Sequence, residues 1–525
     1  MVSREYDGLA GAGGVKDVCR QLAEALVSHG GCHVRVVLPC YGFIDPLALG
    51  FTAVAFNPNR TVFSVDMSYP EQERMEEVSV WWKSLRGVDV YLLDSPRFSE
   101  KTGVYAYTAE DEKHESWQKR GRGHYDYFAM NILLQKATLD LLILLDQRPD
   151  IIHCHDGHAA TLPAMMRELS GYRHFFCNTG CVVTIHNAGK GYHQEIKDLA
   201  FARAVTGLPQ SVLDASLLAG SFDPFMAAAG RAEMNTVSEN YARELQETSD
   251  DARTGWLGHQ LLKRGVRLAG ITNGMNPDDF NPAYPDRLGL AAAFSPGEGD
   301  LAGKMCCKEE MLVSCSGRKR WGSVEQSGHL SQSADLPLFT FIGRLTQQKG
   351  VDVLLETILL LLAEGVEPFQ LLILGSGDPE LESRLQALTT NPDLVGRICF
   401  LKGYDVDLAA KVYAAGDFFL IPSLYEPCGL TDYMAQLMGN LPIVHYVGGL
   451  VKVMDGITGF VYHKQLSAEL ASAMQKALFL YSQDPDRIIT MQKAAVKRIH
   501  DHYSWPDVME KYLRLYRKAC EEAGP

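Results

Sequence analysis

Short apolar runs alternate with stretches of helical periodicity through the second half of the chain. The runs are 338–342, 371–374, 399–401, 418–421 and 443–445. Each is followed by a Gly- or Pro-containing turn, and longer segments such as 351–364 have apolar residues at helical spacing. Because buried parallel strands are apolar throughout and need helical crossovers between them, this alternation predicts a doubly wound α/β domain.

The first half shows the same alternation after a Gly-rich segment that ends at Gly14. Helical spacing begins at Val15, and apolar strands are expected over 34–38, 88–93, 151–153 and 182–185. The segment 125–147 predicts a long amphipathic helix, and the charged, aromatic segment 105–122 predicts a surface loop. Only Met1 and Val2 precede the Gly-rich segment as a first strand, so we expect the natural chain to begin further upstream.

Length and composition change the picture in one respect, which is the number of domains. A chain of 525 residues exceeds one ordinary core, so two large domains are expected. The Ser-rich segment 314–336 predicts the approach to the linker, which places the boundary between residues 330 and 331.

Charge and cysteine usage exclude several classes of function. The net charge of −14 argues against a general nucleic-acid binder. No apolar run is long enough to cross a bilayer and the start lacks a signal-peptide pattern, so no membrane partner is expected. The twelve cysteines contain no CxxC pair, which favours buried thiols in a reducing cytoplasm.

The turn after the strand 418–421 carries the first candidate chemistry. Pro427 and Gly429 predict a tight turn before a helix, and free N–H groups at such a turn favour an anion. Glu426 stands at the mouth of the turn. A carboxylate there does not help to bind phosphate, and it suits an uncharged neighbour with hydroxyl groups, such as a sugar. An ordinary Pro/Gly turn in an α/β domain explains the same residues.

Two cations follow the strand 338–342. Arg344 and Lys349 would stabilise the negative charge that develops on a diphosphate leaving group, without a metal. By spacing alone, a solvated charged turn explains these two residues better than a diphosphate site does. Gly377 lies in a Gly-containing loop after the next strand, and Tyr404 could stack on a base. His155 and His158 have a spacing that metals use, but no third ligand cluster accompanies them, so no metal is expected.

The run Glu426-Pro-Cys-Gly-Leu-Thr431 resembles the signature of bacterial glycogen synthases and plant starch synthases, and Gly343-Arg-Leu-Thr-Gln-Gln-Lys-Gly350 resembles another motif of that family. The resemblance implies two Rossmann-like domains that face each other across a cleft, the GT-B architecture. It implies an acceptor-side catalytic domain over 1–330, a nucleotide-sugar-binding domain over 331–505 and a C-terminal helix over 506–525 that crosses back to the first domain.

The resemblance also implies that some site residues lie in the first half of the chain. Gly13 and Gly14 match the glycines of the family's Lys-x-Gly-Gly-Leu loop, but Gly11 stands where the lysine that touches the donor phosphates would be. Asp156 lies in a segment similar to His-Asp-Trp-His, and His186 lies in one similar to Thr-(Val/Ile)-His-Asn.

The implied reaction moves glucose from a nucleotide diphosphate, which we expect to be ADP-glucose, to an α-1,4-glucan with retention and without a cofactor. The expected catalytic residues are Glu426, Arg344, Lys349, His186 and Asp156. The expected substrate-binding residues are Gly13, Gly14, Asn187, Asn273, Gly377, Tyr404, Cys428, Gly429, Leu430 and Thr431.

Retaining glycosidases use two carboxylates, whereas this sequence offers Glu426 alone, because Met434 occupies the place where some relatives carry a second glutamate. We therefore expect attack assisted by the leaving group, on the donor's own face. Two alternatives stay open. One is a GT-B transferase that uses UDP-glucose or another acceptor, and the other is a glucan-binding pseudo-enzyme, for which Gly11 is the strongest argument.

Overall fold

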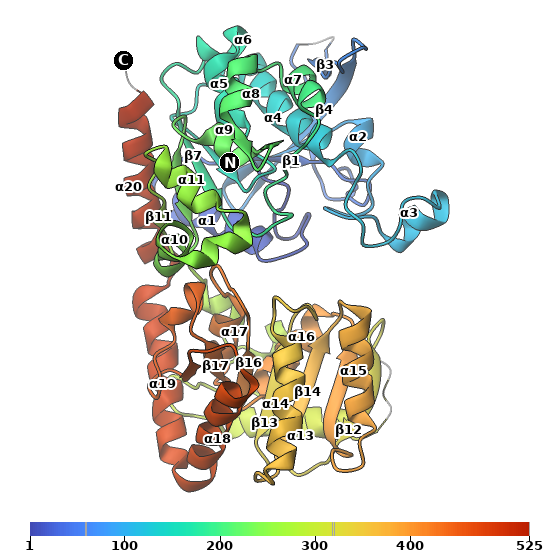
Figure 1. The fold of residues 1–525 in the computed structure, drawn as a ribbon, viewed down its shortest axis with the longest axis vertical. Coiled ribbons are helices and arrows are strands. Elements are labelled where there is room, and N and C mark those ends of the chain that lie inside the picture. Colours follow the sequence, from blue (N-terminus) through green and yellow to red (C-terminus); the bar gives the residue numbers. More distant parts are fainter. Residues whose placement is uncertain (58–59, 318, 320, 524–525) are drawn as a thin grey trace. The chain divides into compact units, whose positions relative to one another are not determined.

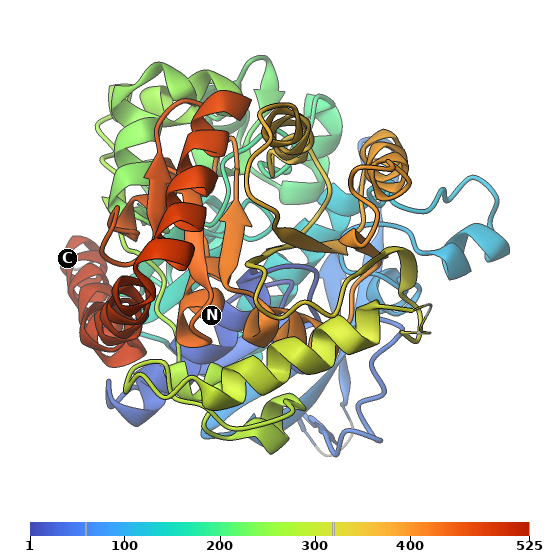
Figure 2. The same ribbon diagram turned by 90° about the horizontal axis from the view of Figure 1, so that it is seen from below.

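The computed structural model describes residues 1–57, 60–317, 319 and 321–523, which divide into two compact units (Figure 1). The first unit contains Met1–Gly274 and the C-terminal segment from Trp505, and the second contains Met275–Ser504. The expected boundary after residue 330 therefore differs from the observed one. The segments α13 (Ala302–Cys315) and β12 (Glu325–Leu330) belong to the second unit, because α13 packs on α16 and β12 pairs with β15 (Figure 2). The prediction was wrong here because β12 is a polar edge strand, and its sequence resembles that of a linker.

The sheet of the second unit has the order β12-β15-β14-β13-β16-β17-β18, and β12 alone runs antiparallel to its neighbour among the described strands. The parallel strands are β13 (Leu338–Ile342), β14 (Gln370–Gly375), β15 (Arg397–Lys402), β16 (Phe418–Ile421), β17 (Leu441–His445) and β18 (Phe460–Tyr462). The chain fills one side of the sheet from β13 outward and then begins the other side at β16. This reversal is the switch point at which doubly wound sheets bind ligands.

Alternate residues of β13 feed two hydrophobic cores, as a strand buried on both faces requires. Phe339 and Phe341 pack into one core, and Leu338 and Ile342 into the other. The first core is covered by α14 (Val351–Ala363), α15 (Pro379–Thr389), α18 (Ser467–Gln483) and α19 (Pro485–His502). The second is covered by α13, α16 (Val406–Ala415) and α17 (Thr431–Leu437). The predicted doubly wound sheet is confirmed.

The first unit contains a parallel group in the order β11-β10-β7-β6 and a mixed group in the order β1-β5-β4-β2, with β3 paired to β4. Val2 forms parallel bridges to Val37 and to Cys154, so the first residues lie between β1 and β6 as the first strand of a doubly wound sheet. The strands are β1 (Arg35–Pro39), β2 (Thr52–Ala53), β3 (Val62–Asp66), β4 (Met75–Leu85), β5 (Val88–Asp94), β6 (Ile151–His155), β7 (Gly180–Ile185), β10 (Glu233–Thr236) and β11 (Ala269–Gly270).

Helices around this sheet differ from expectation in two places. The predicted amphipathic helix is α4 (Tyr127–Leu144), which is buried on nearly all sides; "amphipathic" was wrong, because its polar residues Asn131 and Gln135 form hydrogen bonds inside the core. Among the described residues α4 alone is long and apolar enough to span a membrane, and most of it is packed inside the first unit. The predicted surface loop contains α3 (Ala109–His114), which Thr108 and Asp111 begin with a capping box.

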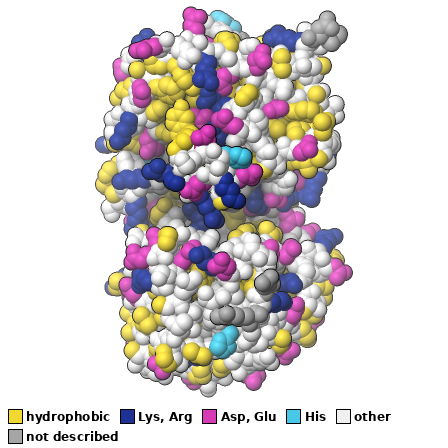
Figure 3. All heavy atoms as spheres, turned by 90° about the vertical axis from the view of Figure 1, so that its right-hand side faces the viewer, with side chains coloured by type: hydrophobic (Ala, Val, Ile, Leu, Met, Phe, Trp, Pro, Cys, Tyr) yellow, Lys and Arg dark blue, Asp and Glu magenta, His cyan; other side chains and the backbone are white. Residues whose placement is uncertain are grey.

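The other helices of the first unit include α1 (Val15–Ser28), α5 (Leu162–Glu168), α7 (Leu199–Thr206), α10 (Glu239–Glu247), α11 (Leu257–Lys263) and the C-terminal α20 (Trp505–Ala523). The helix α20 packs against β7 and α1 (Figure 1). On the face drawn in Figure 3, Lys and Arg side chains of the described residues lie among Asp and Glu side chains.

Candidate active site

In the second unit, the loops that follow β13 and β16 meet at the switch point of the sheet. Lys349 comes from the first loop and Glu426 from the second, and Lys349 Nζ lies 2.6 Å from Glu426 Oε2. Ser423 Oγ donates a second hydrogen bond, of 2.9 Å, to the same oxygen. The structure therefore brings together two expected catalytic residues that are 77 positions apart in sequence.

A backbone contact holds these two loops together. Leu424 N–H donates a 2.8 Å hydrogen bond to the carbonyl of Gln348. Gly350 has a φ of +68°, and a Cβ at this position would overlap with the carbonyl of Pro422. Glycine is required here because it combines the left-handed conformation with the close approach of a neighbouring chain. The position of Lys349 is thus fixed by backbone geometry as well as by its ion pair.

Glu426 is 9% exposed and stays ionised at neutral pH. Burial alone would raise the pKa of this carboxyl. The nearby Lys349 ammonium and the hydrogen bonds from Lys349 and Ser423 outweigh burial, so the pKa of Glu426 lies below its ordinary value. A carboxylate in this state can accept hydrogen bonds from hydroxyl groups, but it cannot serve as a general acid.

Other expected residues lie along the same edge of the sheet. Arg344 lies two residues after the end of β13 and is exposed. The next residue of its loop is tied to the Gly377 loop, because Leu345 N–H donates to Ser376 and the Leu345 carbonyl accepts from Asp378. Tyr404 follows β15 and is 61% exposed. All three loops leave the carboxyl ends of neighbouring strands.

The loop from Cys428 to Thr431 leads from Glu426 into α17. Gly429 has a φ of +73°, which explains the glycine. Within the described part of the chain, the backbone N–H groups of Gly429, Leu430 and Thr431 have no hydrogen-bond acceptor. Cys428 itself is buried. This loop therefore offers a row of backbone donors next to the Lys349 and Glu426 pair.

In the first unit, Asp156 and His186 follow β6 and β7, two neighbouring parallel strands. Asp156 Oδ1 accepts hydrogen bonds from the backbone N–H groups of His186, at 2.7 Å, and Asn187, at 3.4 Å. Asp156 has a φ of +57°, a left-handed conformation that a non-glycine residue rarely adopts. Burial raises the pKa of Asp156 to about 7. Asp156 thus holds the turn that presents His186 and Asn187.

His186 is neutral at physiological pH, because burial lowers its pKa to about 3. Its Nε2 lies 2.9 Å from Nδ1 of His155. Across the residues that the structure describes, no three His, Cys, Asp or Glu side chains lie close enough to hold a metal ion. Asn273, in the segment that follows β11, is buried.

Sequence reasoning missed Glu5, which organises the Gly-rich loop of the first unit. Glu5 Oε2 accepts the backbone N–H groups of Ala12, at 2.7 Å, and Gly13, at 3.1 Å, while Oε1 accepts the Tyr105 hydroxyl at 2.7 Å. Gly14 comes next in the sequence and is the N-cap residue of α1. The available signal was a carboxylate placed directly after the first strand and before a Gly-rich turn.

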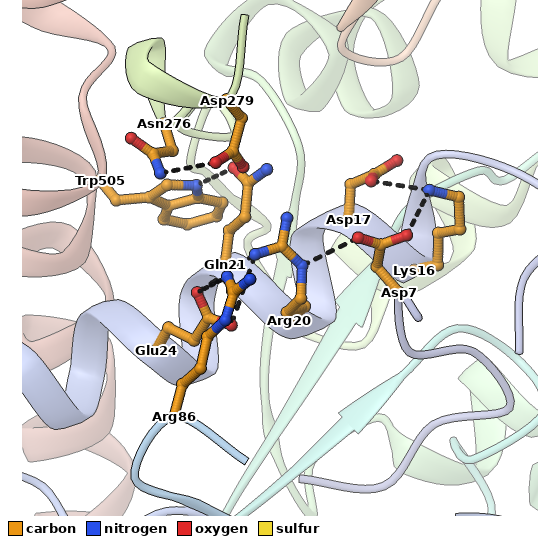
Figure 4. Close-up of polar contacts among 10 residues, drawn as sticks. All are labelled: Asp7, Lys16, Asp17, Arg20, Gln21, Glu24, Arg86, Asn276, Asp279 and Trp505. Carbon is orange, nitrogen blue, oxygen red and sulfur yellow. Dashed lines mark hydrogen bonds and ion pairs between the residues drawn. The ribbon is translucent and has the colours of Figure 1, made fainter. Parts of the chain in front are cut away.

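Gly11, at the family's lysine position, lies beneath the side chain of Lys16. A Cβ at Gly11 would overlap with the Lys16 side chain. Figure 4 shows the Lys16 ammonium directed toward two carboxylates, and it lies 2.8 Å from both Asp7 Oδ1 and Asp17 Oδ1. Arg20 also pairs with Asp7. The local cation is therefore already neutralised by neighbouring acids.

Comparisons with solved structures define the fold. The catalytic domain of starch synthase IV from Arabidopsis thaliana, bound to ADP and acarbose, superposes with a TM-score of 0.77 at 24% identity over 99% of this chain and 98% of that chain. Sucrose-phosphate synthase from Thermosynechococcus elongatus gives 0.58 at 18% identity over 99% and 98%. The fold is that of the GT-B glycosyltransferases, as expected from the sequence.

Sequence comparisons narrow this class to a family. A model of the starch synthase catalytic domain matches residues 1–263, and one of the glycosyl transferases group 1 matches residues 336–479. Glycogen synthase of Aeromonas hydrophila is 31% identical over 99% of this chain and 97% of its own length, and that of Vibrio parahaemolyticus is 30% identical over 99% and 98%. The chain belongs to the glycogen synthase and starch synthase family of glucosyltransferases.

Proposed function

We propose that this chain transfers glucose from ADP-glucose to the non-reducing end of an α-1,4-glucan, with retention of configuration. The observation that carries the proposal is the contact between Lys349 and Glu426 at the switch point of the second unit. It combines a cation for a diphosphate and an ionised carboxylate for sugar hydroxyls within 2.6 Å. Membership of the family supports the glucan acceptor and the nucleotide-sugar donor.

The charges in the second unit suit a reaction in which the bond to the diphosphate breaks first. Lys349 and Arg344, with the N–H groups of Gly429 to Thr431, would stabilise the departing diphosphate. Glu426 would accept hydrogen bonds from the donor sugar. The nearby carboxylate Asp432 lies 3.0 Å from Lys452, in a buried ion pair, so it is not available as a second catalytic carboxylate. This arrangement favours attack assisted by the leaving group over a covalent glucosyl-enzyme.

In the first unit, we assign Asp156 and His186 to the shaping of the sugar pocket. Asp156 fixes the backbone of the turn at His186 through its 2.7 Å hydrogen bond. His186 is neutral, so it can donate a hydrogen bond to a sugar hydroxyl group or accept one from it. It does so without adding charge beside the reacting sugar.

Adenine is proposed as the base of the donor nucleotide. The support is that the starch synthase IV structure, which shares this fold, is bound to ADP. The cations at the switch point supply positive charge, so the proposed reaction uses no metal. We also propose that the protein acts in the cytoplasm, where a glucan polymer and a nucleotide sugar meet.

The test is incubation of the purified full chain with glycogen and radiolabelled ADP-glucose or UDP-glucose. We expect label to enter the polymer from ADP-glucose and to be released as glucose by an α-1,4-specific exoglucanase. The variant Glu426→Gln serves as the negative control. Incorporation from UDP-glucose alone would overturn the donor assignment, and glycogen binding without incorporation from either donor would show a pseudo-enzyme.

A further inference from the structure

A short turn lies directly behind the loop that carries Glu426. This turn, η3 (Gly448–Lys452), follows β17, and Gly449 N–H donates a 2.9 Å hydrogen bond to the carbonyl of Glu426. A Cβ at Gly448 would overlap with that carbonyl, and one at Gly449 would overlap with the carbonyl of Cys428. Two glycines thus allow η3 to approach the loop backbone closely.

Lys452, the last residue of η3, reaches into the same loop with its ammonium group. Lys452 Nζ donates hydrogen bonds of 2.6 Å to the carbonyls of both Cys428 and Gly429, and it lies 3.0 Å from Asp432 Oδ1. It also lies over the ring of Tyr433, 4.4 Å from the centroid. The side chain is only 4% exposed, so the charge is fully engaged within the protein.

These carbonyl contacts fix the direction of two backbone N–H groups. In a planar trans peptide the C=O and the following N–H point in opposite directions. Lys452 on the Cys428 carbonyl therefore turns the N–H of Gly429 away from itself, and its contact with the Gly429 carbonyl does the same for Leu430. These are two of the N–H groups that have no acceptor among the described residues. A cation on each carbonyl also polarises the peptide and makes its N–H a stronger donor.

We propose that Lys452 is a positioning residue, which aims and polarises the N–H groups of Gly429 and Leu430 toward the diphosphate of the donor. This inference rests on the proposed function, because it assumes that the loop binds a nucleoside diphosphate. Lys452 does not touch the ligand; it acts through the two carbonyls. Asp432 balances its charge and lets the ammonium stay buried.

The test removes the ammonium without leaving an unpaired buried charge. The variant Asp432→Asn keeps Lys452 on the two carbonyls, whereas Asp432→Asn with Lys452→Met removes it. Lys304→Met is the matched control. Lys304 is another buried lysine of the second unit, and it donates to the carbonyls of Ala414, Gly416 and Met438, away from this loop.

Calorimetric titration with ADP and with UDP, together with steady-state kinetics and Tm, provides the measurements. Going from Asp432→Asn to the double variant should weaken binding of the preferred nucleotide by about 10- to 100-fold, the range for lost hydrogen bonds to charged groups. The donor KM should rise similarly and the glucan KM should stay the same. Lys304→Met should lower Tm and change nucleotide binding by less than about 3-fold.

The outcomes separate the inference from the function on which it rests. If the wild-type chain binds neither nucleotide, the proposed function fails. If the wild type binds one of them and the double variant binds it as well as Asp432→Asn does, the function stands and the role of Lys452 is refuted. An equal weakening in Lys304→Met would also refute it, because the effect would then follow from general destabilisation.

Discussion

Replacing Lys349 with methionine is the most direct perturbation of the proposed site. Methionine keeps most of the volume of the side chain and removes the ammonium that lies 2.6 Å from Glu426 Oε2. Two separate losses follow. Under the proposed function, the donor diphosphate loses a fixed cation. Among the residues that the structure describes, the buried Glu426 carboxylate then keeps one side-chain hydrogen bond, from Ser423.

The structure gives the size of each loss. Breaking a fully buried ion pair from one side costs about 3–5 kcal/mol. The two side chains are 21% and 11% exposed, so water still reaches part of the pair, and we expect roughly 2–3 kcal/mol of lost stability. For catalysis, removal of one preorganised donor of positive charge typically lowers kcat by about 10²–10³-fold, and we expect that range here.

Two further variants separate the two losses: Glu426→Gln alone, and the double variant that combines Lys349→Met with Glu426→Gln. Glu426→Gln removes the charge that Lys349→Met strands, so the double variant should recover most of the lost stability, to within about 1 kcal/mol of Glu426→Gln alone. Activity should not recover, since the cation is still absent. Urea unfolding measures stability, and glucosyl transfer at saturating donor measures kcat for the same preparations.

Three results would refute this reasoning. Near-normal kcat in Lys349→Met at saturating donor would show that the diphosphate is stabilised elsewhere. Equal destabilisation in Lys349→Met and in the double variant would show that the stranded carboxylate is not the cause of the stability loss. A fall in kcat that is rescued together with stability in the double variant would assign the kinetic effect to misfolding.

Three further predictions concern other parts of the chain. Because burial raises the folded-state pKa of Asp156 to about 7 from an ordinary 3.8, its contribution to stability is present below about pH 4 and is lost as pH rises to about 7; urea unfolding across this window should show a smaller loss in Asp156→Asn. Gly11→Lys combined with Lys16→Ala places a lysine at the family position and removes the side chain that would overlap with it, so calorimetry should show about 10-fold tighter binding of the donor nucleotide, and unchanged binding would mean that the phosphates lie elsewhere. Gly350→Ala should cost more than about 2 kcal/mol in urea unfolding, because a Cβ there overlaps with backbone, whereas Gly365→Ala, with a similar φ of +65° and open space, should cost only about 1 kcal/mol; equal costs would contradict the overlap.

Five parallel strands of the second unit could be predicted from the sequence because each contains an apolar run over most of its length. The expected strands 338–342 and 418–421 match β13 and β16, and the helix expected from Val351 begins there. Burial on both faces leaves a continuous hydrophobic signal that a sequence displays directly. The strand β12 was missed because an edge strand with one polar face resembles a linker.

The site could be predicted only up to the loops that contain it. Turn chemistry indicated Glu426 and Lys349 separately, but the 2.6 Å contact between them depends on the order of the strands, which no local pattern specifies. Glu5 is a second example of a residue whose role could not be predicted from the local sequence. Its role comes from contacts with Gly13 and with Tyr105, which is 100 positions away, and no spacing rule would connect them.

The net charge of the chain and the local charge at the candidate site have opposite signs. The chain carries a net charge of −14, yet the loops at the switch point of the second unit are backed by Lys452 and bordered by Lys349. In the first unit, Lys16 lies in the first turn of α1 and pairs with two aspartates. Under the proposed function, the second unit supplies the positive charge for the diphosphate, and Lys349 and Lys452 are only 21% and 4% exposed, so salt screens them weakly. It follows that nucleotide binding should depend less on salt than contacts made by exposed lysines would.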